Sequence, residues 1–412
     1  MMCSKSIVRW HRALWQGLLV VCLVASTTAE AGDLERQRAR QMFDRLAGVP
    51  PTNAEIDQME TLLLANNATG AAGVAMAKPT FYSVTIKNMV APWTNEAQDV
   101  FVPLNDYTAT VIGLIRDSVD FRQVLSGDVV YVGIGTGIPA YSSSNNANYE
   151  KLEAGDTSGP YDLSVIGGVL QSRQQSLVTS LPAAATAGVM TTRAAAEAFF
   201  SGGTNRLMLR STLMHHLCTD LEPLKDVTRV PDRVRRDVAR SPGGDSRIFL
   251  NSCVGCHAGM DGMAGAFARY EYDEAAGVMQ YQAVNEKFDV NGVALKYNIN
   301  PTNFSYGYVT TNDSWINYWR KGHNFNLGWD TTLPASGNGA KSLGTELANT
   351  RAFSTCQVKK VFKAVCFRDS DNYLADRTEV GLIADAFESD NYKMKNVFAR
   401  VAAYCTDPSQ YQ

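Results

Sequence analysis

The hydrophobic and polar positions of the chain recur mainly with the period of an α-helix. Residues 33–47 predict a charged amphipathic helix that ends at the Gly-Val-Pro-Pro stretch of residues 48–51. Thr52 or Asn53 can cap a second helix, whose apolar positions continue to Leu64. The part of the chain that follows residue 32 is therefore expected to begin with helices.

The same helical periodicity returns several times further along the chain. A short β-branched run at residues 129–134 predicts a strand between helices, and residues 314–320 are expected to form one short helix. Longer helical segments are predicted at residues 101–125, 193–222, 343–366 and 375–405. The pattern as a whole predicts a mainly α fold.

Residues 270–303 change character and favour β structure. Apolar positions from Tyr281 to Leu295 flank the dipeptide Asn291-Gly292, which is a strong signal for a two-residue hairpin turn. We therefore expect a small β-hairpin inserted into an otherwise helical domain.

A segment rich in proline and glycine predicts a domain boundary near the middle of the chain. Three prolines between residues 223 and 242 are followed by Gly243-Gly244. We expect a mostly helical N-terminal domain at residues 32–240 and a second domain at residues 241–412. The arginines of residues 229–240 are interleaved with aspartates, and we interpret that stretch as a solvated linker.

The sequence Cys253-Val254-Gly255-Cys256-His257 carries the most specific chemical signal. C-x-x-C-H is the attachment sequence of c-type haem, because two thiols on one helical turn can form thioethers with the porphyrin while the next histidine binds the iron from the proximal face. A zinc site would need a second ligand pair at metal spacing, which this sequence lacks. A thioredoxin-like redox pair would leave the histidine unexplained. We predict one covalent haem c held by Cys253, Cys256 and His257.

The first 31 residues predict an exported protein. Three basic residues, the last of them Arg12, precede an apolar stretch at residues 13–25, and Ala29-Glu30-Ala31 offers a cleavage site. We expect residues 1–31 to be a signal peptide and the remaining protein to be periplasmic or secreted, with no membrane span. The formal net charge of −3 at pH 7 gives no indication of nucleic-acid binding.

Cysteines outside the haem motif predict two disulfides in an exported chain. Residues 350–368 read as one helix, on which Cys356 and Cys366 would lie about 15 Å apart. That separation is beyond the reach of a disulfide. We predict that each of these two bonds either Cys218 or Cys405, the alternative being that some of the four are buried free thiols.

The sequence leaves the sixth ligand of the iron open. His323 follows the predicted helix that ends near Gly322, and Met279 is the second candidate. Met260 and Met263 start from the proximal side, and we expect them to pack around the haem edge. The N-terminal region could supply a ligand only if it folds over the haem, and its candidates are Met214, His215 and His216.

Residues 246–263, which read Ser-Arg-Ile-Phe-Leu-Asn-Ser-Cys-Val-Gly-Cys-His-Ala-Gly-Met-Asp-Gly-Met, resemble the planctomycete-type mono-haem cytochrome c domain of large exported bacterial proteins. Those proteins follow C-x-x-C-H with two residues, an apolar residue and Asp-Pro, and here Gly262 stands in place of the proline. Shorter segments similar to such proteins occur at residues 46–52, 187–193 and 351–356. The resemblance implies an exported haem protein with a cytochrome c-like second domain, and it implies no substrate.

Three functions are compatible with these features. The leading hypothesis is a mono-haem c-type cytochrome that transfers one electron to or from a partner oxidoreductase, with no residue assigned as catalytic. One alternative is a haem enzyme, such as a peroxidase or oxygenase, with an open sixth position on the iron. The other is a partner-binding or polymer-binding protein in which the haem has a sensory or structural role. An electron carrier is favoured over a catalyst, because only one C-x-x-C-H motif is present.

Overall fold

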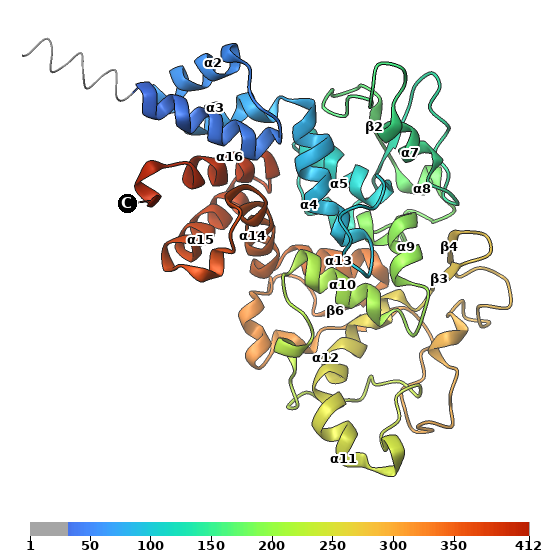
Figure 1. Cartoon of the computed structure of the whole chain (residues 1–412). Helices are drawn as coiled ribbons and strands as arrows, with labels where there is room; N and C mark the ends of the chain where they lie inside the picture. Colours follow the sequence, from blue (N-terminus) through green and yellow to red (C-terminus); the bar gives the residue numbers. More distant parts are fainter. Residues whose placement is uncertain (1–31, 412) are drawn as a thin grey trace, which may run out of the picture.

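Residues 32–411, which the computed structural model describes, form a mainly helical fold with three small two-stranded antiparallel sheets (Figure 1). The mainly α fold predicted from the sequence is confirmed. The signal peptide expected at residues 1–31 lies outside the described residues.

The N-terminal helices pack against the last helix of the chain. The predicted first helix spans residues 32–47, and α2 spans Asn53–Leu64. Thr52 begins α2 with a capping box, as the sequence predicts. α3 (Ala68–Met76) then lies against α16 (Met394–Cys405), so the two ends of the described chain lie side by side (Figure 1).

The middle of the chain surrounds α5 (Asp106–Arg116), a helix in which every residue is buried. β1 (Val130–Gly133) packs against it and pairs antiparallel with β2 (Leu170–Arg173), which confirms the strand predicted at residues 129–134. The other helices of this region are α4 (Lys87–Val90), α6 (Gln123–Ser126), α7 (Ala147–Ala154), α8 (Gln175–Val178), α9 (Arg193–Phe199) and α10 (Arg206–His216).

The segment with the C-x-x-C-H motif forms three connected helical pieces at one end of the molecule. α11 (Ser246–Ile248) passes through a π-helical turn (Phe249–Cys253) into α12 (Val254–Ala264). α12 packs mainly against α10 and against the strand β5 (Ser314–Ile316). α11 and α12 lie at the opposite end of the molecule from α2, α3 and α16 (Figure 1).

The β-hairpin lies earlier in the chain than the sequence suggests. β3 (Tyr270–Asp273) pairs antiparallel with β4 (Val278–Tyr281). Its turn is closed by Gly277, which has φ +68° and donates to the carbonyl of Asp273. Asn291-Gly292 does form a turn, but the Asp289 carboxylate accepts from the backbone N–H groups of Asn291 and Val293. These local bonds replace a strand ladder, and a single isolated bridge remains beside the turn.

The helix predicted at residues 314–320 is wrong. β5 pairs antiparallel with β6 (Ser336–Asn338), and only Tyr318–Arg320 is helical, as one 3-10 turn. Asn317 caps this turn, because its side chain accepts from the backbone N–H of Trp319.

The chain finishes with four helices, two of which are joined to other parts of the fold by disulfides. α14 (Arg351–Cys366) confirms the helix predicted around Cys356. Cys218 bonds Cys356, and Cys366 bonds Cys405, so the predicted exclusion of a Cys356–Cys366 bond is confirmed. The other late helices are α13 (Gly339–Ala348), α15 (Leu374–Ser389) and α16.

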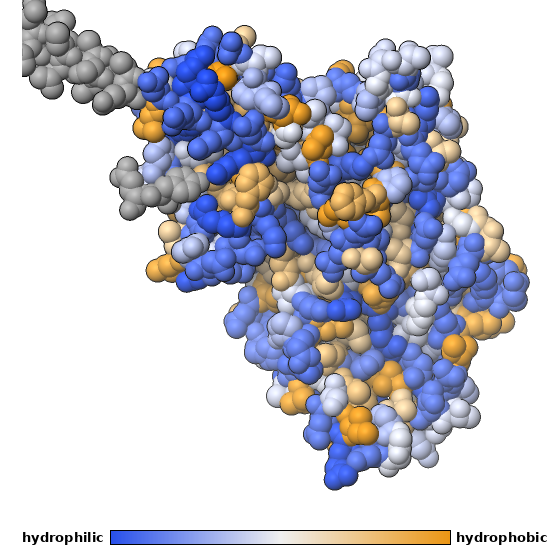
Figure 2. All heavy atoms as spheres, viewed as in Figure 1, coloured by the Kyte–Doolittle hydropathy of each residue, from blue (hydrophilic) through white to orange (hydrophobic). Residues whose placement is uncertain are grey.

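The main hydrophobic core draws residues from both sides of the boundary predicted at residues 240 and 241. Two smaller clusters lie under the loops near the haem motif and beside the β3–β4 hairpin. The division into two domains therefore stays a prediction. Among residues 32–411, no helix is long and apolar enough to cross a membrane. The face drawn in Figure 2 is mostly hydrophilic, with apolar side chains in scattered groups.

Candidate functional site

The C-x-x-C-H motif lies across the junction between the π-helical turn and α12. Cys253 ends the π-helical turn, while Cys256 and His257 lie in the first turn of α12. Both thiols are half-buried and neither forms a disulfide. The Sγ atom of Cys256 contacts the carbonyl oxygen of Leu221 at 3.6 Å. Burial raises the pKa of the Cys256 thiol, which is the opposite of the thiolate-stabilising surroundings of redox C-x-x-C sites.

His257 is oriented by a carboxylate one helical turn further along α12. Its Nδ1 lies 3.2 Å from Oδ1 of Asp261, which is fully buried. Both carboxylate oxygens of Asp261 also accept from Arg206, so this carboxylate acts only as an acceptor. Nδ1 of His257 must therefore carry the proton of the neutral ring. Nε2 is left as the nitrogen whose lone pair can bind a metal.

Arg206, the first residue of α10, connects Asp261 to a second aspartate. Its Nε lies 2.7 Å from Oδ1 of Asp261, and its Nη1 lies 2.7 Å from Oδ2 of Asp237. Burial favours the neutral form of Asp261, but the charge of Arg206 and hydrogen bonds from His257 and Arg206 outweigh it and hold the pKa of Asp261 well below its usual range. The hydrogen-bonded side chains His257, Asp261, Arg206 and Asp237 thus form a series that fixes the orientation of the imidazole through charge-assisted hydrogen bonds.

The arginine-rich stretch before the motif is partly buried, which differs from the solvated linker expected from its sequence. Arg235 is 1% exposed, donates to the carbonyl of Asp261 and to the hydroxyl of Thr310, and lies over the ring of Tyr297. Arg240 lies over two aromatic rings, one of them Phe249 of the π-helical turn. Arg235 therefore packs against α12, and Arg240 packs against the π-helical turn that precedes it.

Glycines allow α12 to approach its neighbours closely. A Cβ atom on Gly259 would collide with the indole of Trp319, which is fully buried against the helix. A Cβ on Gly255 would touch Lys225, and the backbone N–H of Asp226 donates to the carbonyl of Gly255 at 3.0 Å. The segment at residues 221–227 therefore lies against the first turn of α12.

The residues suggested for the sixth iron position lie in different surroundings. His323 is exposed at the start of a 3-10 turn (His323–Leu327). Met279 is buried on β4, which packs against α9. His215 and His216 are buried beside Trp93. Met260 and Met263 on α12 are buried in the main core.

The donor set of the motif suits a c-type haem and offers little to a bare metal ion. Two free thiols three residues apart and one histidine with an available Nε2 are the groups that covalent haem attachment requires. Within residues 32–411, no three or more His, Cys, Asp and Glu side chains are grouped so that they could hold a metal ion alone. The residues present fit the cofactor that the sequence predicts.

Sequence reasoning missed the groups that orient His257. Asp261 entered only as part of the resemblance, Asp237 entered only as one of the aspartates of the expected solvated linker, and Arg206 did not enter at all. The spacing of four residues between His257 and Asp261 was a usable signal, because residues four apart on a helix are neighbours. The contribution of Arg206 had no such signal, since it comes from α10 and depends on the tertiary fold.

Comparisons with protein-family models, with curated proteins and with solved structures each found no match. The functional interpretation therefore rests on Cys253, Cys256 and His257 and on the groups that surround them.

Proposed function

We propose that the chain is an exported mono-haem c-type cytochrome that transfers one electron to or from a partner oxidoreductase. The observation that carries this proposal is the C-x-x-C-H motif, in which two free thiols stand next to a histidine whose Nδ1 is already engaged by Asp261. The resemblance of residues 246–263 to planctomycete-type cytochrome domains supports it. A haem held there would supply one reversible electron at its iron.

In this proposal each residue of the site has a separate role. Cys253 and Cys256 form the two thioethers, and Nε2 of His257 is the proximal ligand. Asp261 holds the imidazole in the required tautomer, and Arg206 holds Asp261. The site helix lies at one end of the molecule, where a redox partner can approach (Figure 1).

An oxidising location, periplasmic or secreted, is part of the same proposal. The bonds Cys218–Cys356 and Cys366–Cys405 support it, because disulfides persist in exported proteins and are rare in reducing compartments.

A haem enzyme of the peroxidase type is the second candidate. The carboxylate of Asp261 on Nδ1 of His257 favours it, since a carboxylate makes the imidazole a stronger electron donor than a neutral acceptor would. Such donation stabilises the higher oxidation states of iron that a peroxidase or oxygenase uses.

Visible spectra of the exported, reduced protein with and without carbon monoxide separate the two candidates. An electron carrier has both axial positions filled, so its reduced bands should not change under carbon monoxide. A clear shift would show an open or weakly held sixth position and would favour the enzyme. For a closed iron, His323→Ala and Met279→Ala then identify the ligand, because only the loss of the true ligand should create a carbon monoxide-binding form.

A further inference from the structure

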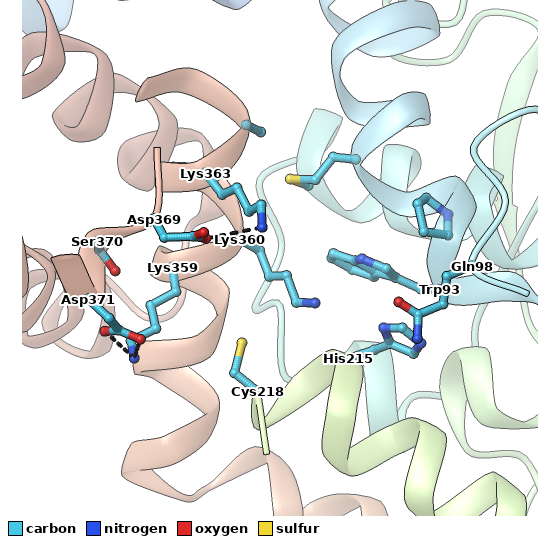
Figure 3. Close-up of a pocket in the computed structure, with 13 residues that line it drawn as sticks. Trp93, Gln98, His215, Cys218, Lys359, Lys360, Lys363, Asp369, Ser370 and Asp371 are labelled. Atoms are coloured by element: carbon cyan, nitrogen blue, oxygen red, sulfur yellow. Dashed lines mark hydrogen bonds and ion pairs between the residues drawn. The ribbon is translucent and has the colours of Figure 1, made fainter. Parts of the chain in front are cut away.

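One cavity contains none of the residues of the C-x-x-C-H motif (Figure 3). It is lined by three lysines and by an aromatic wall, which consists of Trp93 and His215. Its volume is about 450 Å³. Trp93 comes from the 3-10 turn after α4, His215 from the end of α10, and Lys360 from the middle of α14. Lys360 extends from its helix across the cavity toward Trp93 and His215 (Figure 3).

Lys360 has no carboxylate partner among the described residues, unlike the other two lysines of the cavity. Lys359 is paired with Asp371 at 2.7 Å, and Lys363 is paired with Asp369 at 3.1 Å. Lys360 instead lies with its Nζ 5.4 Å from the centre of the Trp93 ring. The cavity thus contains one half-buried ammonium group whose charge is not balanced.

The aromatic wall beside Lys360 is closely packed, and its Trp93 side chain is only 2% exposed. The rings of Trp93 and His215 are stacked, with centroids 6.3 Å apart and planes inclined by 19°. His215 is 5% exposed, and its Nδ1 is buried without a hydrogen-bond partner. Met89 and Pro92, which are both partly exposed, also line the cavity. An apolar ligand body could lie against these two residues while its charged end meets Lys360.

A disulfide holds the walls of the cavity together. Cys218 follows α10 and bonds Cys356, which lies one helical turn before Lys360 on α14. The bond fixes the helix that carries His215 relative to the helix that carries Lys360. The cavity is therefore preorganised, which lowers the entropic cost of binding.

We propose that this cavity binds a small organic carboxylate, whose apolar body lies against Met89 and Pro92 while its carboxylate pairs with Lys360. The single unbalanced ammonium group matches the single charge of a carboxylate. The apolar walls favour an organic body over inorganic phosphate. The proposal does not depend on the haem, because it rests on a different set of residues.

The charge state of Lys360 predicts how binding varies with pH. Burial and the charge of Lys363 lower the pKa of Lys360 to about 8. The other charged groups around the cavity are Lys359, Asp369 and Asp371, and both aspartates are paired with lysines. Because the anion binds the protonated amine, affinity should be retained below pH 8 and should fall as the pH rises above it.

Benzoate is a suitable probe, measured by calorimetry on the full exported chain with benzyl alcohol and inorganic phosphate for comparison. We expect saturable binding of one benzoate, and no binding of the other two. Lys360→Met should weaken benzoate binding by about tenfold or more, the loss expected for one charge-assisted hydrogen bond. Lys395→Met is the matched control, because Lys395 also lies over an aromatic ring, that of Tyr82, but outside this cavity.

A second readout uses the unmodified chain. Benzoate should protect the Lys360 amine, but not the Lys395 amine, from acylation by a limiting amount of reagent, as measured by peptide mass spectrometry. The proposal is overturned if benzoate shows no saturable binding, if Lys360→Met binds it as well as the unmodified chain does, or if phosphate binds more tightly than benzoate.

Discussion

Nδ1 of His257 lies 3.2 Å from Oδ1 of Asp261, and this carboxylate is fully buried against the guanidinium of Arg206. The contact gives the histidine of the C-x-x-C-H motif one defined tautomer and one free nitrogen. It also places a negative charge directly behind the proposed axial ligand. Both consequences can be tested without assuming what the protein reacts with.

Replacing this carboxylate should change the redox potential and leave haem attachment intact. In Asp261→Asn the His257 imidazole loses an anionic acceptor that favours ferric iron, so the midpoint potential should rise. A hydrogen bond to a charged group contributes about 1.5 kcal/mol, and only the part that differs between ferric and ferrous iron shifts the potential. We therefore expect a rise of up to about 60 mV for a one-electron couple. Spectroscopic redox titration measures the shift.

Asp237→Asn is the matched control for that experiment. Asp237 binds the other side of Arg206 and is not hydrogen-bonded to His257. Its replacement should move the potential much less than Asp261→Asn does. Equal shifts in the two variants would mean that the network acts through general charge and not through the contact with His257.

Two buried histidines should make the protein less stable as the pH falls from 6.5 toward 3. Burial and the charge of Lys360 lower the pKa of His215 to about 3, and burial holds the pKa of His216 well below its usual range. Since the folded pKa lies below the unfolded one, stability is complete above pH 6.5 and is lost below it. At pH 5 the loss should be about 2 kcal/mol for His215 relative to pH 7.5, and His216 should add to it in the same direction.

Urea unfolding at pH 5 and at pH 7.5 isolates the contribution of His215 to the pH dependence of stability. In His215→Phe, which keeps the aromatic contact with Trp93, the pH dependence should be smaller by about 2 kcal/mol. A His215→Phe variant that is as sensitive to pH as the unmodified chain would contradict the assignment.

The two disulfides should contribute unequally to stability. Cys218–Cys356 spans 138 residues, whereas Cys366–Cys405 spans 39. Because the entropy removed from the unfolded chain grows with loop length, replacing the first pair by alanines should cost about 1 kcal/mol more than replacing the second. Denaturant unfolding of the two double variants gives the comparison, and a greater cost for the shorter loop would be contrary to it.

A methyl group on the site helix should destabilise the fold because of the close contact with Trp319. Gly259→Ala places a Cβ atom inside the indole, so we expect a loss of about 2 kcal/mol. Gly381→Ala on α15 is the control, since its Cβ meets no atom within 4 Å, and it should stabilise the protein by about 0.5 kcal/mol. Thermal unfolding measures both, and equal effects would show that the packing of Trp319 does not constrain α12.

Local sequence patterns predicted the elements of the fold that are determined by residues close together in the sequence. The cap at Thr52, the strand at residues 129–134 and the helix around Cys356 each depend on a few neighbouring residues. Residues 314–320 were predicted wrongly, because the apolar spacing there is compatible with a helix until Ser314–Ile316 pairs with β6. That pairing partner is distant in sequence and has no local signal.

The residues of the candidate site likewise fall into those that a local sequence signal predicts and those that it does not. Cys253, Cys256 and His257 could be predicted because the motif is contiguous. Arg206 could not, since it reaches Asp261 from another helix. Arg235 was interpreted as solvated because its sequence neighbours are charged, yet it is buried among Asp261, Thr310 and Tyr297. Burial of a charged residue depends on partners that only the tertiary structure supplies.

The most direct test of the central claim is the intact mass, under denaturing conditions, of the full chain exported from a host that attaches c-type haem. We predict one haem per chain that survives denaturation, located on the peptide that contains Cys253 and Cys256. The double variant Cys253→Ser/Cys256→Ser should carry none, while Cys218→Ala/Cys356→Ala should keep it. A protein without covalent haem, with both motif thiols open to alkylation, would contradict the account.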